Sequence, residues 1–291
     1  MMRLEILKTY KLYIGGKFPR TESGRYHSFM NGKEHVANVC KASRKDLRDA
    51  VVAARGAQSS WWQKSAYNRS QILYRIAEMM EGRKIQFVEE LILQGYTKTR
   101  ASKEVDLSID RWVYYAGWCD KYQQIFSSVN PVASSHFNFS VLEPMGVICL
   151  LPTAGQPLLE VISMVAPAIA AGNSVIVVND LESPLSVITL GEVLHTSDLP
   201  GGVVNILTAH HEELLPHLSV HMDINAVLVG DMKPQDLKTL QKEAAVNVKR
   251  VSRSASKDLL ETLDPYLMRK LSEVKTTWHP IEAIGASGSG Y

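Results

Sequence analysis

The strongest nucleophile that a side chain offers near neutral pH is a cysteine thiolate, and this sequence contains three cysteines. Cys40, Cys119 and Cys149 are far apart and lie among apolar or aromatic residues. This odd number of isolated cysteines predicts buried thiols in a reducing compartment rather than disulfide bonds. The first ten residues lack the apolar core of a signal peptide, so we expect a cytoplasmic protein.

Four histidines and two glutamates lie close together in segment 210–221, and imidazole with carboxylate is a common ligand set for metal ions. The residues are His210, His211, His217, His221, Glu212 and Glu213. A metal cluster is one interpretation. Their spacing does not follow the pattern of zinc sites, so we expect solvated helix ends and no metal.

The composition argues against two classes of partner. The net charge of +2 and the dispersed Lys and Arg residues exclude a basic face for nucleic acid. An aromatic group resembles a platform for stacking bases, but its helical spacing and the lack of interleaved cations favour packing: Trp112, Tyr114, Tyr115 and Trp118. No apolar run is long enough to span a membrane.

The segment 143–178 predicts the unit that organises the chain. An apolar run over 147–151, an apolar stretch of helix formers and a second apolar run over 172–178 indicate strand, helix and strand. Pro157 suits the first position of the helix, and Gly172 suits its end. The helix has almost no polar face, so we expect it to be buried.

Alternating patterns continue after this unit. Helices are predicted over 184–194, 212–218 and 233–245, and strands over 203–207, 226–229 and 248–251. This order predicts an α/β fold, a Rossmann-like doubly wound parallel sheet with helices on both faces. The compact Gly-x-Gly-x-x-Gly fingerprint is missing, so the sequence alone does not predict a dinucleotide site.

The N-terminal part is predicted to be mainly helical. Gly15 and Gly16, between two alternating runs, predict a tight hairpin. Two amphipathic helices are expected within 44–80, the first with a capping box from Ser43 to Asp46. Further helices are expected over 87–94 and 103–126, and a strand over 136–142.

Seven stretches, in the same order, resemble the aldehyde dehydrogenase superfamily over roughly residues 10–257. They are 12–17, 50–55 with Trp62, 69–77, 143–147, 166–173, 199–206 and 249–251. The run from Tyr13 to Arg20 and the altered turn 152–157 look most like the divergent second region of family 16 members. The resemblance implies the fold of that superfamily.

The resemblance also implies which residues should carry the chemistry. In that superfamily a cysteine thiolate attacks an aldehyde, a hydride passes to NAD(P), and a Glu activates water. No cysteine follows Cys149, and Ser254 stands where the Glu is expected. The Asn that donates to the oxyanion is missing from the turn 152–157, and Gln156 is not expected to replace it.

The cofactor positions that the resemblance implies are changed as well. Asn179 replaces the Lys that reaches the ribose, and Glu182 matches a neighbouring ribose contact. Gly230 and Asp231 replace the Gly-Ser turn that faces the pyrophosphate. We expect Asp231 to be the N-cap of the next helix, where its carboxylate repels phosphate. These four residues are therefore predicted to be vestigial cofactor positions, with no cofactor expected.

The resemblance divides the chain into parts and leaves no catalytic domain. The parts are 1–135, the hairpin and helices of the cofactor domain; 136–142 and 272–279, the strands of a small β oligomerisation arm; 143–257, the Rossmann-like domain; 258–271, a connecting helix; and 280–291, a flexible tail. The two arm strands are expected to pair with each other.

Two functions follow from these expectations. The first is a catalytically inactive aldehyde dehydrogenase-like scaffold, a homo-oligomer that binds a protein partner or a related aldehyde dehydrogenase chain. The alternative is an NAD- or NADP-dependent aldehyde dehydrogenase whose catalytic part comes from another chain or from a longer isoform.

Overall fold

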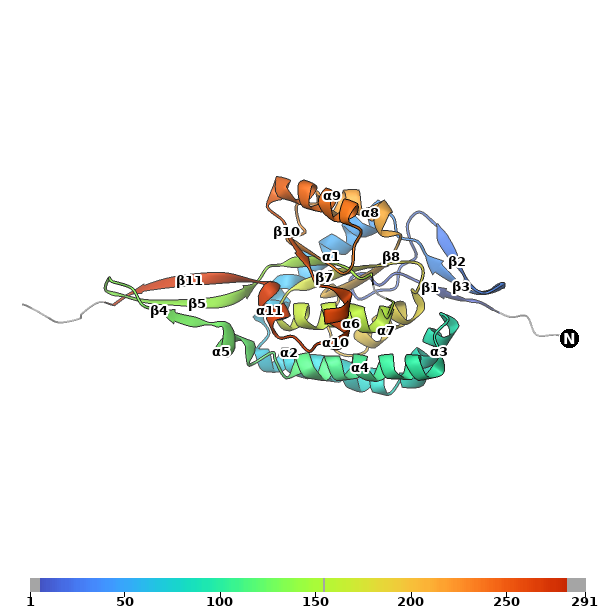
Figure 1. Ribbon diagram of the computed structural model, residues 1–291, viewed down its shortest axis with the longest axis horizontal. Helices are drawn as coiled ribbons and strands as arrows, with labels where there is room; N and C mark the ends of the chain where they lie inside the picture. Colours follow the sequence, from blue (N-terminus) through green and yellow to red (C-terminus); the bar gives the residue numbers. More distant parts are fainter. Residues whose placement is uncertain (1–5, 154, 282–291) are drawn as a thin grey trace, which may run out of the picture.

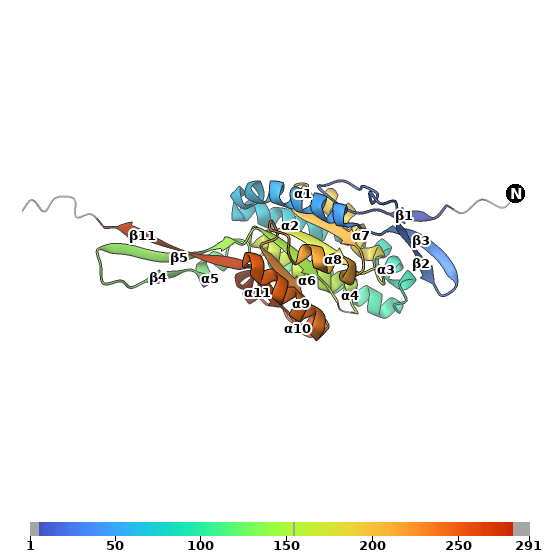
Figure 2. The same ribbon diagram turned by 90° about the horizontal axis from the view of Figure 1, so that it is seen from above.

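The computed structural model describes residues 6–153 and 155–281. The molecule is elongated, with a central α/β body and a three-stranded sheet at each end (Figure 1, Figure 2). Within this described part, no helix has the length and apolarity needed to cross a membrane. Of the tail expected over 280–291, residues 282–291 lie outside the described residues.

Five parallel strands form the central sheet in the order β10-β9-β6-β7-β8. The strands are β6 (Val147–Leu151), β7 (Ser174–Asn179), β8 (Val204–Thr208), β9 (Ala226–Val229) and β10 (Arg250–Arg253). The chain proceeds from β6 to β8 in one direction and then adds β9 and β10 on the other side, which is the Rossmann order. The predicted doubly wound parallel sheet is confirmed.

Helices cover both faces of this sheet (Figure 1). One face carries α1 (Arg44–Gln63), α8 (His211–Leu218) and α9 (Pro234–Ala244), and the other carries α6 (Pro157–Ala170) and α7 (Leu185–His195). A single 3-10 turn, η1 (Ala245–Asn247), follows α9. The strand expected from residue 248 begins only at Arg250, because Val248 adopts a left-handed φ of 56°.

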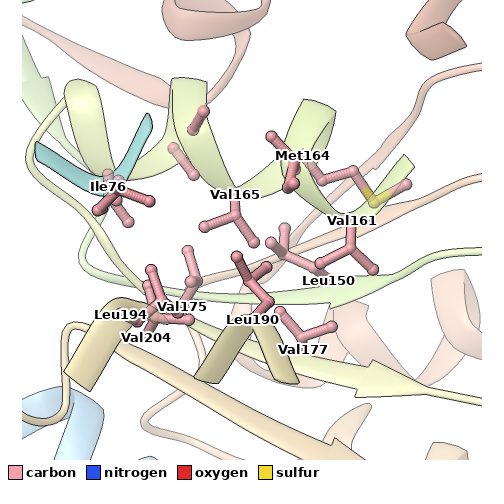
Figure 3. Packing of buried hydrophobic residues seen from close by; sticks show 14 of the residues in the cluster. Ile76, Leu150, Val161, Met164, Val165, Val175, Val177, Leu190, Leu194 and Val204 are labelled. Atoms are coloured by element: carbon pink, nitrogen blue, oxygen red, sulfur yellow. The ribbon is translucent and has the colours of Figure 1, made fainter. Parts of the chain in front are cut away.

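The alternation of side chains along each strand divides the interior into two cores. In β6, Val147, Cys149 and Leu151 pack in the cluster with α1, whereas Ile148 and Leu150 pack in the cluster with α6. Figure 3 shows Leu150 beside Val161 and Val165 of α6. Every residue of α6 is buried, as predicted, and Pro157 is its first residue.

A second helical layer packs outside α6 and α7: α2 (Ala66–Glu81), α3 (Lys84–Leu93) and α4 (Lys98–Ala116), followed by α5 (Tyr122–Phe126). The prediction of one helix over 103–126 is wrong, because α4 begins at Lys98 and ends at Ala116, and the chain turns from its C-cap residue Gly117 before α5 begins. Trp112 and Tyr115 are fully buried, which confirms packing for these two aromatic residues. The capping box of Ser43 and Asp46 at the start of α1 is also confirmed.

The N-terminal sheet contains a hairpin that sequence patterns did not indicate. Its strands are β1 (Lys8–Tyr10), β2 (Tyr26–Asn31) and β3 (Glu34–Cys40), in the order β1-β3-β2. The hairpin predicted at Gly15 and Gly16 is only a tight turn with positive φ, closed by one bridge from Ile14 to Lys17. The run before that turn is not free to form a hairpin, because Tyr13 pairs with Ile206 at the edge of the central sheet.

The sheet at the opposite end consists of β4 (Ser128–Asn130), β5 (His136–Pro144) and β11 (Ser272–Pro280), in the order β11-β5-β4. β5 and β11 are antiparallel over nine residue pairs, so their predicted pairing is confirmed. The connecting helix expected over 258–271 is instead two short helices, α10 (Ser256–Glu261) and α11 (Tyr266–Lys270). Pro265 separates them, because proline lacks the N–H that a continuous helix needs.

Candidate functional site

The switch point of the central sheet lies between the carboxyl ends of β6 and β9, where open α/β sheets bind their ligands. Thr153 follows β6, and Gly230 and Asp231 follow β9. The amide nitrogen of Gly230 donates to the carbonyl oxygen of Leu151 at 3.1 Å, so the two strand ends are held together. Three cavities lie along this edge of the sheet. The third, of about 880 Å³, shares Thr153 and Asp231 with the second and is also lined by Gln156, Glu261 and the cations Arg100, Lys103 and Lys257.

The first cavity has a volume of about 420 Å³ and brings Asn179 and Glu182 together. Asn179 is only 4% exposed, and its Nδ2 donates to the carbonyl oxygens of Asp180 at 2.8 Å and Ser183 at 3.3 Å. Its amide group therefore holds the loop after β7. Glu182 is exposed, and its backbone nitrogen donates to the Oδ1 of Asp180.

The second cavity, of about 300 Å³, brings Glu182 together with Asp231. The prediction that Asp231 caps α9 is wrong, because Lys233 is the N-cap and Pro234 is the first helical residue. Asp231 thus lies two residues before the cap. It forms an ion pair with Arg253 at 3.2 Å.

Carboxylates outnumber cations around the first two cavities, whereas three cations and two carboxylates line the third. Five acidic residues and one lysine line the second cavity: Asp180, Glu182, Glu212, Asp231, Asp236 and Lys233. Glu160 adds a further acidic residue to the first. A like charge at about 4 Å from a phosphate costs roughly 1 kcal/mol in bulk water and more near a protein. The lining of the first two cavities therefore disfavours phosphate groups and favours cationic or neutral ligands.

None of the three cysteines lines any of these cavities. All three are buried free thiols, as predicted. Burial raises the pKa of Cys119 and of Cys149 to about 12, and Cys149 lies within β6. A thiolate is the reactive form, so these two thiols are unreactive near neutral pH.

The histidines differ from their prediction in one respect. His211 is not solvated: its Nε2 donates to the carbonyl oxygen of Val178 at 2.7 Å, and burial lowers its pKa. His210 is half exposed, with its Nδ1 3.7 Å from the Oδ2 of Asp180. Among residues 6–153 and 155–281, no group of three or more His, Cys, Asp or Glu side chains is arranged to hold a metal ion.

Of the two other positions that the resemblance implied, Gln156 lines the third cavity, and Ser254 lies outside all three. Gln156 is the N-cap residue of α6, and its side chain makes no capping hydrogen bond. The backbone nitrogen of Ser254 donates to the carbonyl oxygen of Val229 at 3.0 Å, at the end of β9.

Two buried carboxylates near this edge were missed by the sequence interpretation. The Oε1 of Glu104 accepts hydrogen bonds from the backbone nitrogens of Leu158 at 3.0 Å and Leu159 at 3.3 Å, so Glu104 satisfies two of the free amide groups at the start of α6. The Oε2 of Glu160 accepts from the backbone nitrogen of Thr153 at 2.9 Å. A signal existed, because each glutamate lies on an otherwise apolar helix face.

Comparison with known proteins places this geometry in a family. The model of the Aldehyde dehydrogenase family matches residues 23–254. The putative aldehyde dehydrogenase DhaS of Bacillus subtilis is 30% identical over 250 residues, which are 84% of this chain and 50% of DhaS. The cytosolic 10-formyltetrahydrofolate dehydrogenase of Xenopus tropicalis is 31% identical over 251 residues, 84% of this chain and 28% of that protein.

Solved structures agree with these relatives. Aldehyde dehydrogenase C of Pseudomonas syringae, solved with NAD+ and octanal, superposes with a TM-score of 0.77 at 28% identity, over 84% of this chain and 50% of that chain. The aldehyde dehydrogenase of Bacillus cereus gives a TM-score of 0.80 at 24% identity, which shows the shared fold, over 85% of this chain and 51% of that chain.

The similarity covers only part of each relative's length. The chain spans about half the length of DhaS and 28% of the Xenopus protein. These relatives do not address the likeness to family 16 members, which stays a prediction. The resemblance to the superfamily is confirmed, and this chain belongs to the aldehyde dehydrogenase family.

Proposed function

We propose that this chain is a non-catalytic member of the aldehyde dehydrogenase family that acts by binding a protein partner or a related aldehyde dehydrogenase chain. The observation that carries this proposal is the acidic lining of the two cavities that contain the predicted cofactor positions Asn179 and Glu182. A dinucleotide would have to place its phosphates among Asp180, Glu182 and Asp231. The four predicted cofactor positions are thus vestigial, and neither NAD nor NADP is used.

The state of the chemical groups supports the same proposal. The thiols of Cys119 and Cys149 are buried and protonated near neutral pH. The resemblance implies Ser254 at the position of the general base, and a serine hydroxyl does not accept a proton near neutral pH without a neighbouring base. The amide of Asn179 holds its own loop. None of these groups supplies the thiolate, the base or the ribose contact that aldehyde oxidation requires.

The sheet of β4, β5 and β11 supplies a surface for assembly, and we propose that copies of this chain associate through it. It projects from the body (Figure 2). It exposes large apolar side chains: Val129, Phe137, Val274 and Trp278. Several large apolar side chains exposed on one small sheet are typical of a surface that binds another protein chain. The buried free thiols support a reducing, cytoplasmic location.

One preparation tests both parts of the proposal. The purified chain is expected to oxidise aliphatic and aromatic aldehydes with NAD or NADP no faster than a blank. Light scattering after size exclusion is expected to give a mass larger than that of one chain. Turnover above the blank would remove the claim of inactivity, and a monomer at every concentration would remove the assembly claim.

A matched pair of variants locates the interface. Phe137→Asp places a charge on the arm, where the side chain is 47% exposed, and is expected to reduce the mass to that of a monomer. Tyr67→Asp places the same charge at an exposed aromatic residue of α2 and is expected to leave the mass unchanged. Equal effects of the two substitutions would argue against the arm.

A further inference from the structure

The family match ends at residue 254, and the chain that follows packs back onto the body. We name residues 255–271 the strap. It contains α10 and α11, which lie over α6 and beside α4 (Figure 1). Its buried side chains belong to the main hydrophobic core: Leu267, Met268 and Leu271. The strap is therefore an integral part of the fold.

Side chains of α4 donate hydrogen bonds to backbone carbonyl oxygens of the strap. Three residues donate to four carbonyl oxygens: Arg111 to Leu260 (3.1 Å) and Thr262 (2.7 Å), Tyr114 to Leu263 (3.1 Å) and Tyr115 to Asp264 (2.9 Å). The four acceptors fall within five consecutive residues. The strap is consequently held at a fixed distance from α4 and α6.

Between the strap and these two helices lies a cavity of about 320 Å³. Three cationic residues line it, one from α4, one from β10 and one from α11: Arg111, Arg253 and Lys270. Arg111 is only 3% exposed, and burying a guanidinium group is costly unless anionic or strongly polar groups surround it. The strap carbonyl oxygens supply such polar groups to Arg111, and Arg253 pairs with Asp231 at 3.2 Å, so the wall carries three cations of which at least one is already paired with a carboxylate.

Hydroxyl groups complete the polar lining, from Tyr115, Ser163, Ser254 and Thr262. The buried hydroxyl groups of Tyr115 and Ser163 already donate to the carbonyl oxygens of Asp264 at 2.9 Å and Leu159 at 2.7 Å. The hydroxyl donors toward a ligand are therefore those of Ser254 and Thr262. One carboxylate, Asp264, also lines the cavity, and its Oδ1 accepts from the backbone nitrogen of Tyr266 at 2.8 Å. Cations therefore outnumber carboxylates here, which is the reverse of the lining of the first two cavities at the switch point.

We propose that the cavity under the strap binds a small oxyanion, a phosphate or carboxylate group held by arginine, lysine and hydroxyl donors. Arginine provides a planar fork that matches both kinds of group. The volume is at the low end of the range for small-molecule sites, roughly 300–1,000 Å³, which restricts the ligand to a small one. This proposal stands whether or not the chain is catalytic.

Thermal unfolding with added anions tests the proposal. The chain is titrated with inorganic phosphate and, separately, with malonate, each against sodium chloride of equal ionic strength. Binding to the folded state alone raises the melting temperature in a saturable manner. We expect saturation with at least one of the two anions and none with chloride, and the tighter anion identifies the preferred group.

Two arginines of β10 provide the matched variants. Arg253→Gln removes a cation of the cavity and is expected to raise the Kd at least about tenfold. Arg250→Gln is the control, because Arg250 donates to the carbonyl oxygen of Ser272 and pairs with Glu273, outside the cavity. Ser254→Ala removes a hydroxyl group that lines the cavity and is expected to weaken binding without loss of fold. No saturable shift, or equal weakening by the two arginine variants, would overturn the proposal.

Discussion

Trp61→Ala is expected to lower the free energy of unfolding by about 4 kcal/mol, the range for removing a buried aromatic side chain. Trp61 is fully buried in the main core, and its Nε1 donates to the carbonyl oxygen of Ile169 at 2.8 Å. This contact joins α1 to the last turn of α6 across the edge of the central sheet. Urea unfolding followed by circular dichroism measures the loss.

Two further tryptophan substitutions separate packing from hydrogen bonding. Trp61→Phe keeps much of the ring and is expected to cost less, since the backbone nitrogen of Gly172 still donates to the Ile169 oxygen. Trp278→Ala removes a side chain that is 55% exposed on the arm and is expected to cost under about 1 kcal/mol. A Trp61→Ala loss as small as that of Trp278→Ala would show that the seam between α1 and α6 does not stabilise the fold.

Glu104→Gln is expected to change how stability depends on pH. Burial raises the pKa of Glu104 to about 7 from an ordinary value of 4.5, although the Leu158 and Leu159 amides act in the opposite direction. The folded state therefore keeps a proton that the unfolded state loses between these two values. Stability contributed by this group is lost as the pH rises from about 4.5 to 7, by on the order of 3 kcal/mol.

The difference between the variant and the parent isolates this group from the histidines. His211 and His27 have lowered pKa values, so their protonation reduces stability at acidic pH in both proteins. We subtract the free energy of unfolding of the parent from that of Glu104→Gln. This difference is expected to rise between pH 5 and pH 8 by on the order of 3 kcal/mol. Asp110→Asn, at an exposed position of the same helix, is the control. A flat difference would show that Glu104 ionises normally.

The central sheet was predictable because its signals are local. The apolar run of β6, Pro157 at the start of α6 and Gly172 after its end each specify backbone conformation without distant partners. The strands β5 and β11 are far apart in sequence, and their pairing was predicted from the resemblance to a known family.

The candidate site was less predictable because its side chains contact residues that are far away in the sequence. Asp231 had the residue type of an N-cap, but Pro234 begins α9 too late for that role. Glu104 and Glu160 carried a local signal, a charge on a mainly apolar face. The acceptor role of Glu104 depends on where α4 meets the start of α6, and that of Glu160 depends on how the loop after β6 turns back to α6. Residues 258–271 of the strap were expected as one helix, and nothing local indicated that the carbonyl groups of this segment would meet Arg111.

The claim that the switch point no longer accepts a dinucleotide is tested most directly by calorimetric titration with NAD+ and NADP+. Aldehyde dehydrogenase C of Pseudomonas syringae, which has been solved with NAD+, is the positive control. We predict no saturable heat from this chain at nucleotide concentrations that saturate the control. Saturable binding of either nucleotide at those concentrations would contradict the account.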